Sequence, residues 1–260
     1  MNKTTVKTRA IVLHSIKYGD NSLIVKMLTE ESGLLSFMVK NVFGKKSKMK
    51  AALFQNMTLL DIVSESGNGS LSFIKELSLA HYYKDITTNI KKSTIIFFIS
   101  ELLSKTITES ETDTALFDFI FNAMIWLDEA ENDYVNFPIL FAIRLSAYLG
   151  FFPNIDTYSE GSCFDLLDGN FKKNQNDIYQ MEPELSRTFY EILEVTRPCD
   201  SIGDSLKFSS SHRLTDLETH RLSLKERRKL LEHIATYYKL HVEDMRELGS
   251  YEILKTVFEN

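Results

Sequence analysis

The sequence predicts an α+β protein in which an N-terminal five-stranded barrel precedes an all-α helical domain. Two changes of pattern carry this prediction. Short β-rich runs separated by turn sequences fill residues 8–77, and helical spacing of apolar residues begins at about Leu79. Only ten Gly and four Pro occur among 260 residues, which leaves room for long helices. We therefore expect a barrel domain over 1–78 and a helical domain over 79–260, with an irregular, turn-rich insert at 151–220.

The strands of the barrel are predicted by five runs of β-forming residues, which cover 8–17, 22–29, 34–43, 52–63 and 71–77. The third run alternates, so that Phe37 and Val39 share one face and Lys40 lies on the other. Five short, closely spaced strands suit a five-stranded barrel, of which the OB-fold is the example that binds nucleic acids. Such barrels bind single strands with a charged groove and aromatic side chains on which bases stack.

The helices are predicted by apolar residues at helical spacing over 91–105 and 113–130. Pro138 suits the first position of a third helix, which is nearly all apolar. Ser223 and Glu226 have the spacing of a capping box, so we expect the final long helix to begin there.

Charge is distributed unevenly along the chain. The net charge is −6, but residues 1–50 hold ten basic and three acidic side chains, a local charge of +7 that leaves −13 for residues 51–260. A basic module in an acidic chain often meets a polyanion, and a solvated lysine face is the alternative. The candidate DNA-binding side chains are the basic residues on or beside the predicted barrel: Lys7, Arg9, Lys17, Lys26, Lys40, Lys45, Lys46, Lys48 and Lys50.

The densest basic segment is the loop at 44–50. Its Gly-Lys-Lys-Ser start lacks the earlier glycine of a phosphate-binding loop, because position 39 is Val, so we expect no nucleotide site. Four lysines within six residues can instead neutralise phosphates and release counterions. A solvated loop without a partner is the other interpretation. Phe43 beside the loop could stack on a base or belong to the core.

A second set of cations lies in the helical part. Arg144 is the one charged residue of the apolar third helix, and it could form an internal salt bridge or receive a carboxylate of a partner protein. Cations also crowd the start of the final helix, where they oppose the helix dipole, which hints at an anionic partner or at ion pairs within the helix. The candidate partner-binding residues are Arg144, Arg221, Arg227 and Arg228, with Lys225 and Lys229 in the same cluster.

No motif in the sequence indicates catalysis, a cofactor or a metal. The six histidines show no metal-ligand spacing with Cys, and neither a Gly-x-Ser-x-Gly elbow nor a dinucleotide-binding glycine pattern occurs. Two distant cysteines suggest reduced thiols. The longest purely apolar run is far short of the roughly 20 residues that cross a bilayer. We expect a non-enzymatic, cytoplasmic protein with no cofactor and no membrane contact.

Ordered motifs along the chain resemble those of the bacterial recombination mediator RecO family. In the N-terminal part they are Ala10-Ile-Val-Leu, Tyr18-Gly-Asp, Leu28-Thr with Gly33, and Gly44 with a basic Lys-Ser-Lys segment. In the helical part they are Ser100-Glu-Leu-Leu, Arg144, Leu149-Gly-Phe-Phe-Pro, and Tyr237-Tyr with His241. Many family members carry a four-cysteine zinc site after the Gly-Phe-x-Pro segment, whereas this region holds only Cys163, so we expect no structural zinc.

The resemblance implies a role in DNA repair and recombination. Family members bind single- and double-stranded DNA, anneal complementary strands, and work with the partner RecR at the nucleoid. They dock the acidic, Phe-ended C-terminal tail of single-strand-binding protein on the helical domain and help RecA displace that protein. Two other functions stay open from the residues alone: an OB-fold RNA-binding module, and a nuclease or phosphotransferase whose motif is not recognisable.

Overall fold

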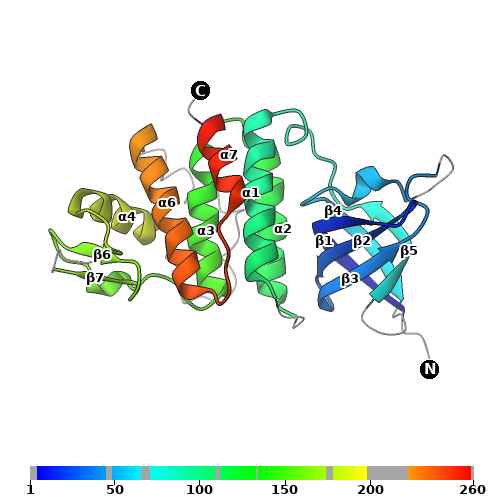
Figure 1. The fold of residues 1–260 in the computed structure, drawn as a ribbon, viewed down its shortest axis with the longest axis horizontal. Helices are drawn as coiled ribbons and strands as arrows, with labels where there is room; N and C mark the ends of the chain where they lie inside the picture. The colour runs from blue at the N-terminus through cyan, green and yellow to red at the C-terminus, as the bar shows by residue number, and fades with distance from the viewer. Residues whose placement is uncertain are drawn as a thin grey trace. The chain divides into compact units, whose positions relative to one another are not determined.

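The computed structural model describes residues 5–44, 49–65, 71–108, 112–132, 134–173, 178–197 and 222–258. The chain forms two compact units, residues 1–129 and 130–260. The first unit contains five strands and two long helices, and the second contains the remaining helices and a short hairpin (Figure 1).

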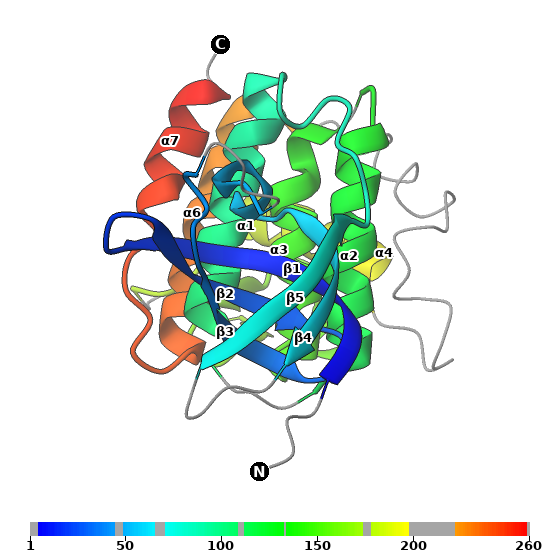
Figure 2. The same ribbon diagram turned by 90° about the vertical axis from the view of Figure 1, so that its right-hand side faces the viewer.

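The five strands of the first unit close into a barrel (Figure 2). They are β1 (Thr5–Tyr18), β2 (Ser22–Thr29), β3 (Gly33–Val39), β4 (Leu59–Glu65) and β5 (Leu71–Leu79). Their order around the barrel is β1-β2-β3-β5-β4, and β1 pairs with both β2 and β4. All neighbours are antiparallel except β3 and β5, which run parallel. The predicted α+β class with an N-terminal five-stranded barrel of the OB-fold type is confirmed.

The barrel interior is filled by alternate residues of its strands, as the period of two requires. Val12, Val25 and Phe37 are fully buried in this core. The run 52–63, predicted as a single strand, is instead a 3-10 turn η1 (Ala51–Phe54) followed by the start of β4. Phe54 is buried in the barrel core, which accounts for the apolar pattern of a segment that is not a strand.

The two helices of the first unit are α1 (Ile90–Thr106) and α2 (Thr114–Glu129). Asn89 caps α1 by accepting hydrogen bonds from the main-chain N–H groups of Lys91 and Lys92. α1 packs against β1, where the Ser100 hydroxyl donates a 2.8 Å hydrogen bond to the carbonyl of Leu13. Both helices begin and end within one residue of the bounds expected from apolar spacing.

The second unit combines helices with a small hairpin. Its elements are η2 (Tyr134–Asn136), α3 (Phe137–Tyr148), η3 (Ile155–Thr157), β6 (Cys163–Asp165), β7 (Asn170–Lys172), α4 (Pro183–Thr196), α6 (Leu224–His241) and α7 (Gly249–Val257). Buried Tyr238 of α6 donates a 2.6 Å hydrogen bond to the carbonyl of Ala142 on α3. The capping box of Ser223 and Glu226 is confirmed at the start of α6.

The insert at 151–220 contains more regular structure than expected. The turn-rich stretch forms the hairpin β6–β7. Residues 183–196 form helix α4, and this helix was not predicted from the sequence. In this hairpin Phe164 and Phe171 pack edge to face, and Phe164 also meets Phe189 of α4. Aromatic packing thus holds the described part of the insert together.

In the part of the chain that the structure describes, none of the helices has both the length and the apolarity needed to span a bilayer.

Candidate DNA-binding face and partner pocket

The outer face of strands β2 and β3 is cationic. Val25 and Phe37 point into the core, so Lys26, Ser36 and Lys40 follow the opposite, outward alternation. Lys26 lies directly across from Ser36, and Lys40 is exposed just after β3. The sequences of the two strands, SLIVKMLT and GLLSFMV, contain no carboxylate. A polyanion on this face would therefore meet positive charge from Lys26 of β2 and from Lys40 just after β3, and no negative charge from either strand.

Apolar and aromatic side chains lie among these cations. Met38 of β3 is paired with Phe73 of β5, and the ammonium of Lys40 lies 5.9 Å from the centre of the Phe73 ring. Ile24, across from Met38, is only half-buried. Charge combined with accessible rings and aliphatic surface is what proteins use to hold backbone phosphates and stack bases of single strands.

The tip of the β1–β2 hairpin extends this surface. Ile16 and Tyr18 are on the same face of β1 and are more than half exposed, at 56% and 57%. The ammonium of Lys17 lies 5.8 Å from the ring centre of Phe43, which is itself half exposed. Phe43 therefore does not belong to the barrel core. The main-chain N–H of Val42 donates a 2.9 Å hydrogen bond to Asn21, which holds this segment against the hairpin turn.

Of the other candidate lysines on or beside the barrel, two are exposed and three lie outside the described residues. Lys7 is exposed on β1 across from Val63 of β4, and Lys50 is exposed immediately before η1. Lys45, Lys46 and Lys48 lie outside the described residues.

Arg9 is engaged by acidic and aromatic groups of its own unit. Its guanidinium donates to Glu30 at 2.8 and 2.6 Å and to Asp118 of α2 at 2.7 Å. It also lies over the rings of Phe117 and Phe121, 5.2 and 4.7 Å from their centres. The hydrogen bond from Arg9 lowers the pKa of Glu30. With its donors used in this way, Arg9 joins the barrel to α2, and we do not include it in the proposed DNA-binding face.

Three of the candidate partner-binding arginines differ in accessibility, and the fourth, Arg221, lies outside the described residues. Arg144 on α3 is buried, with 5% of its surface exposed, so a partner protein cannot reach it without rearrangement of the unit. Arg227 donates from Nε to the side chain of Asn136 at 2.9 Å and from Nη2 to the carbonyl of Leu222 at 3.2 Å. Arg144 is thus buried in the second unit, and the guanidinium of Arg227 is held by hydrogen bonds within that unit.

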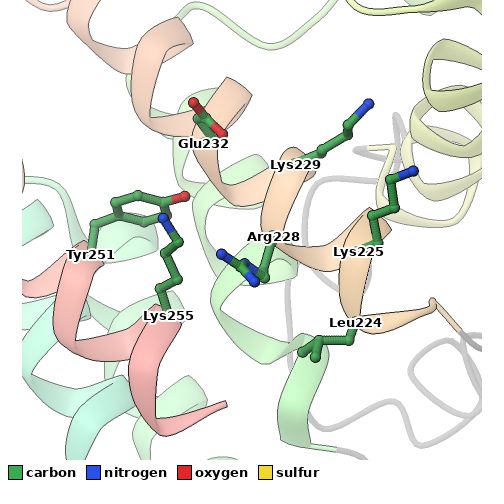
Figure 3. A pocket seen from close by; sticks show the side chains of 7 residues that line it. All are labelled: Leu224, Lys225, Arg228, Lys229, Glu232, Tyr251 and Lys255. Atoms are coloured by element: carbon green, nitrogen blue, oxygen red, sulfur yellow. The ribbon is translucent and has the colours of Figure 1, made fainter. Parts of the chain in front are cut away.

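Arg228, in contrast, lines a pocket between α6 and α7. The pocket has a volume of about 390 Å³ and is lined by Leu224, Lys225, Arg228, Lys229, Glu232, Tyr251 and Lys255. Figure 3 shows Arg228 extending from α6 toward Lys255 and Tyr251 of α7, while Lys225 and Lys229 point to the other side of α6. Lys229 forms a 2.9 Å ion pair with Glu182. On the α7 side of the pocket, Arg228 and Lys255 lie near a leucine and a tyrosine, and Glu232 is the one carboxylate of the lining, which suits an anion that carries an apolar group.

Comparisons with known proteins identify the family of both parts of the chain. Residues 1–83 match the family model described as "Recombination protein O N terminal", and residues 87–251 match "Recombination protein O C terminal". The DNA repair protein RecO of Flavobacterium psychrophilum is 34% identical over 255 residues, which is 97% of this chain and 99% of that protein. The DNA repair protein RecO of Bacteroides fragilis is 33% identical over 254 residues, with the same two coverages. That of Porphyromonas gingivalis is 28% identical over 261 residues, or 98% of this chain and 99% of that protein.

The chain belongs to the RecO family of DNA repair proteins. The resemblance inferred from the ordered motifs is thus confirmed.

In the insert of this RecO-family chain, the cysteine that the structure describes, Cys163, is buried. Cys163 on β6 is 2% exposed, and burial raises the pKa of its thiol. Beside it, buried Asp165 pairs with Lys172 across the hairpin at 2.9 Å. Across the described residues, no three His, Cys, Asp or Glu side chains gather as metal ligands would. Cys199 lies outside the described residues.

Some residues of the two surfaces could not be found from local sequence. Phe73 reaches the cationic face because β5 pairs with β3 in parallel, a long-range pairing without a local signal. Lys255 and Tyr251 join Arg228 only through the position of α7. Their spacing of four residues on an amphipathic helix does place them on one face, and this was the available signal.

Proposed function

We propose that this RecO-family protein is a recombination mediator that binds single- and double-stranded DNA through its barrel, without enzymatic activity. The observation that supports this most directly is the outer face of β2 and β3, where Lys26 and Lys40 lie among accessible apolar and aromatic side chains and neither strand contributes a carboxylate. Lys7, Lys17 and Lys50 add exposed charge on the same barrel. Lys45, Lys46 and Lys48, which lie outside the described residues, are proposed as further DNA contacts from the sequence alone.

The proposed mechanism is electrostatic. Each lysine that contacts a phosphate displaces condensed counterions, so binding is independent of base sequence and weakens steeply with salt. Two complementary strands held on one cationic surface repel each other less than in solution. Annealing would then proceed without ATP or a metal, because base pairing itself supplies the driving force.

The pocket between α6 and α7 is the proposed site for the acidic, Phe-ended tail of single-strand-binding protein. Arg228 and Lys255 would pair with carboxylates of the tail, and the phenyl ring would lie against Leu224 and Tyr251. We retain the tail as the partner of the C-terminal cations and move the binding role from buried Arg144 to this pocket. RecR and, indirectly, RecA complete the proposed set of partners at the cytoplasmic nucleoid.

Strand annealing in the presence of single-strand-binding protein tests this proposal. Complementary oligonucleotides are coated with that protein in its full-length form or with its C-terminal tail removed, and duplex formation is followed with and without this chain. We expect acceleration on strands coated with the full-length protein and a large loss of acceleration when the tail is absent. Equal rates with and without this chain on both substrates would refute the mediator role.

A further inference from the structure

A second hollow lies in the first unit, between the barrel and the start of α1. It has a volume of about 470 Å³, within the roughly 300–1,000 Å³ range of sites that hold small organic groups. Its walls come from the ends of β1 and β2, from η1 and the residues after it, from the segment before α1, and from the first two turns of α1.

The hollow offers a flat aromatic surface and polar edges. Phe97 of α1 lines it and is 56% exposed, although an aromatic ring of this size is ordinarily buried. Gln55, which is exposed, and Asn56, which is half-buried, supply side-chain amides to the lining, and no described residue hydrogen-bonds to either amide. Each amide carries donors and an acceptor, which is the chemistry that reads the edge of a nucleobase.

The walls are held by internal hydrogen bonds. The hydroxyl of Tyr83 donates to the carbonyl of Met57 at 2.6 Å, and that of Ser93 donates to the carbonyl of Ile86 at 2.6 Å. Thr58 donates to the carbonyl of Gln55 at 2.7 Å, which fixes the turn that presents the two amides. The hollow is therefore formed before any ligand arrives, which lowers the entropy cost of binding.

The residues that line the hollow carry no charge, but two lysines lie next to lining residues. All thirteen lining residues are uncharged. Lys17 lies directly across from the lining residue Leu23, and exposed Lys50 immediately precedes the lining residue Ala51. An uncharged aromatic cavity with cations at its rim matches a nucleotide, whose base is flat and uncharged and whose phosphates are anionic. A purely apolar peptide side chain would use neither the amides nor the cations.

We propose that this hollow receives one unstacked base of single-stranded DNA. The base lies against Phe97, its polar edge meets Gln55 and Asn56, and the flanking phosphates meet Lys17 and Lys50. This inference rests on the proposed DNA-binding function and adds a site that distinguishes a single strand from a duplex, because paired bases cannot enter it.

The test compares two fluorescein-labelled chains of equal length, oligo(dT) and an abasic chain that carries the same phosphates without bases. Binding to the full-length protein is measured by fluorescence anisotropy at one salt concentration. We expect the wild type to bind oligo(dT) at least about fivefold more tightly than the abasic chain, the size expected for one stacked base. Phe97→Ala should reduce the preference for oligo(dT) over the abasic chain by about fivefold or more, the contribution of one stacked base, and duplex binding should stay unchanged. Gln55→Ala, at an exposed position, should narrow the difference in the same direction.

The matched control is Tyr82→Ala, which removes a more exposed aromatic residue, at 72%, that does not line the hollow. It should keep the wild-type preference. Equal binding of both chains by the wild type, or an unchanged preference in Phe97→Ala, would overturn the base site and leave phosphate binding by the barrel intact. Failure of the wild type to bind either chain would overturn the base site together with the proposed function.

Discussion

The guanidinium of Arg9 on β1 donates a 2.7 Å hydrogen bond to the carboxylate of Asp118 on α2. The same guanidinium holds Glu30 and covers two phenylalanine rings of α2. A residue that counts toward the positive charge of the barrel therefore ties the barrel to a helix. Its contacts predict a variant that changes stability more than DNA affinity.

Replacing Arg9 by Ala should lower the free energy of unfolding by about 1 kcal/mol, because the pair with Glu30 is partly exposed and screened. Arg9→Lys should recover only part of this loss, since an ammonium cannot form the two parallel hydrogen bonds to Glu30. Urea unfolding followed by fluorescence of Trp126, the one tryptophan of the sequence, reports on this unit. Unchanged stability in Arg9→Ala together with reduced DNA affinity would contradict the structural role.

Asp128 at the end of α2 predicts an acid-sensitive contact between this helix and the segment 84–86 of the first unit. Its buried carboxylate accepts hydrogen bonds from the main-chain N–H groups of Lys84, Asp85 and Ile86 and contacts His81 Nε2 at 3.1 Å. Burial opposes ionisation, but the main-chain donors outweigh it and the pKa of Asp128 is lowered. The carboxylate therefore contributes stability that is fully present above its unfolded pKa of about 4 and is lost as pH falls through the lower, folded value.

We expect Asp128→Asn to cost about 2–3 kcal/mol at pH 7 and to flatten the decline of stability below about pH 5. Glu129→Gln, at the exposed neighbouring position, should stay within about 0.5 kcal/mol of the wild type. Urea titrations at pH 7 and at about pH 2–3, below the unfolded pKa of an aspartate, compare the three proteins. Equal pH dependence of Asp128→Asn and the wild type would show that this carboxylate does not control acid stability.

The pocket between α6 and α7 predicts a partner-specific defect. Changing Arg228 and Lys255 together to Ala should weaken binding of an acidic, Phe-ended tail peptide at least about tenfold, because each charge-assisted pair at a carboxylate contributes about 1 kcal/mol or more. Fluorescence polarisation with a labelled peptide measures this. Arg187→Ala removes an exposed arginine of the same unit that pairs with Glu191, and it should bind the peptide normally. Parallel losses in both variants would point to general electrostatics instead of a site.

Most of the local structure could be predicted from the sequence where local pattern and tertiary packing agree. The second strand has the predicted bounds of 22–29, and the Ser223 cap forms as its spacing requires. The segment 52–58 differs because Phe54 fills the barrel core from a 3-10 turn, and burial alone cannot separate a turn from a strand. Helix α4 did have a signal, since Leu185, Phe189 and Ile192 recur at helical spacing after Pro183.

The composition of the sequence predicts which region carries the candidate DNA-binding site. It does not predict which side chains pair with one another in the fold. The excess of basic residues in the first fifty identified the barrel as the positive module. It could not separate Arg9, whose partners lie 21 and 109 residues away, from Lys26 and Lys40 on the outer face. Likewise, the sequence of an apolar helix does not show how deeply its arginine is buried, and Arg144 is buried in the structure. Partner choice between distant residues is set by the tertiary fold.

The salt dependence of DNA binding tests the central claim, that the outer face of β2 and β3 neutralises phosphates, most directly. The logarithm of the association constant for a duplex is measured against the logarithm of salt concentration for the wild type and for Lys26→Ala/Lys40→Ala. Lys75→Ala serves as the control, because this lysine of β5 is paired with Glu65. The double variant should bind all sequences more weakly and lose about two units of slope, about one for each phosphate contact, while the control keeps the wild-type slope. An unchanged slope in the double variant would contradict the account.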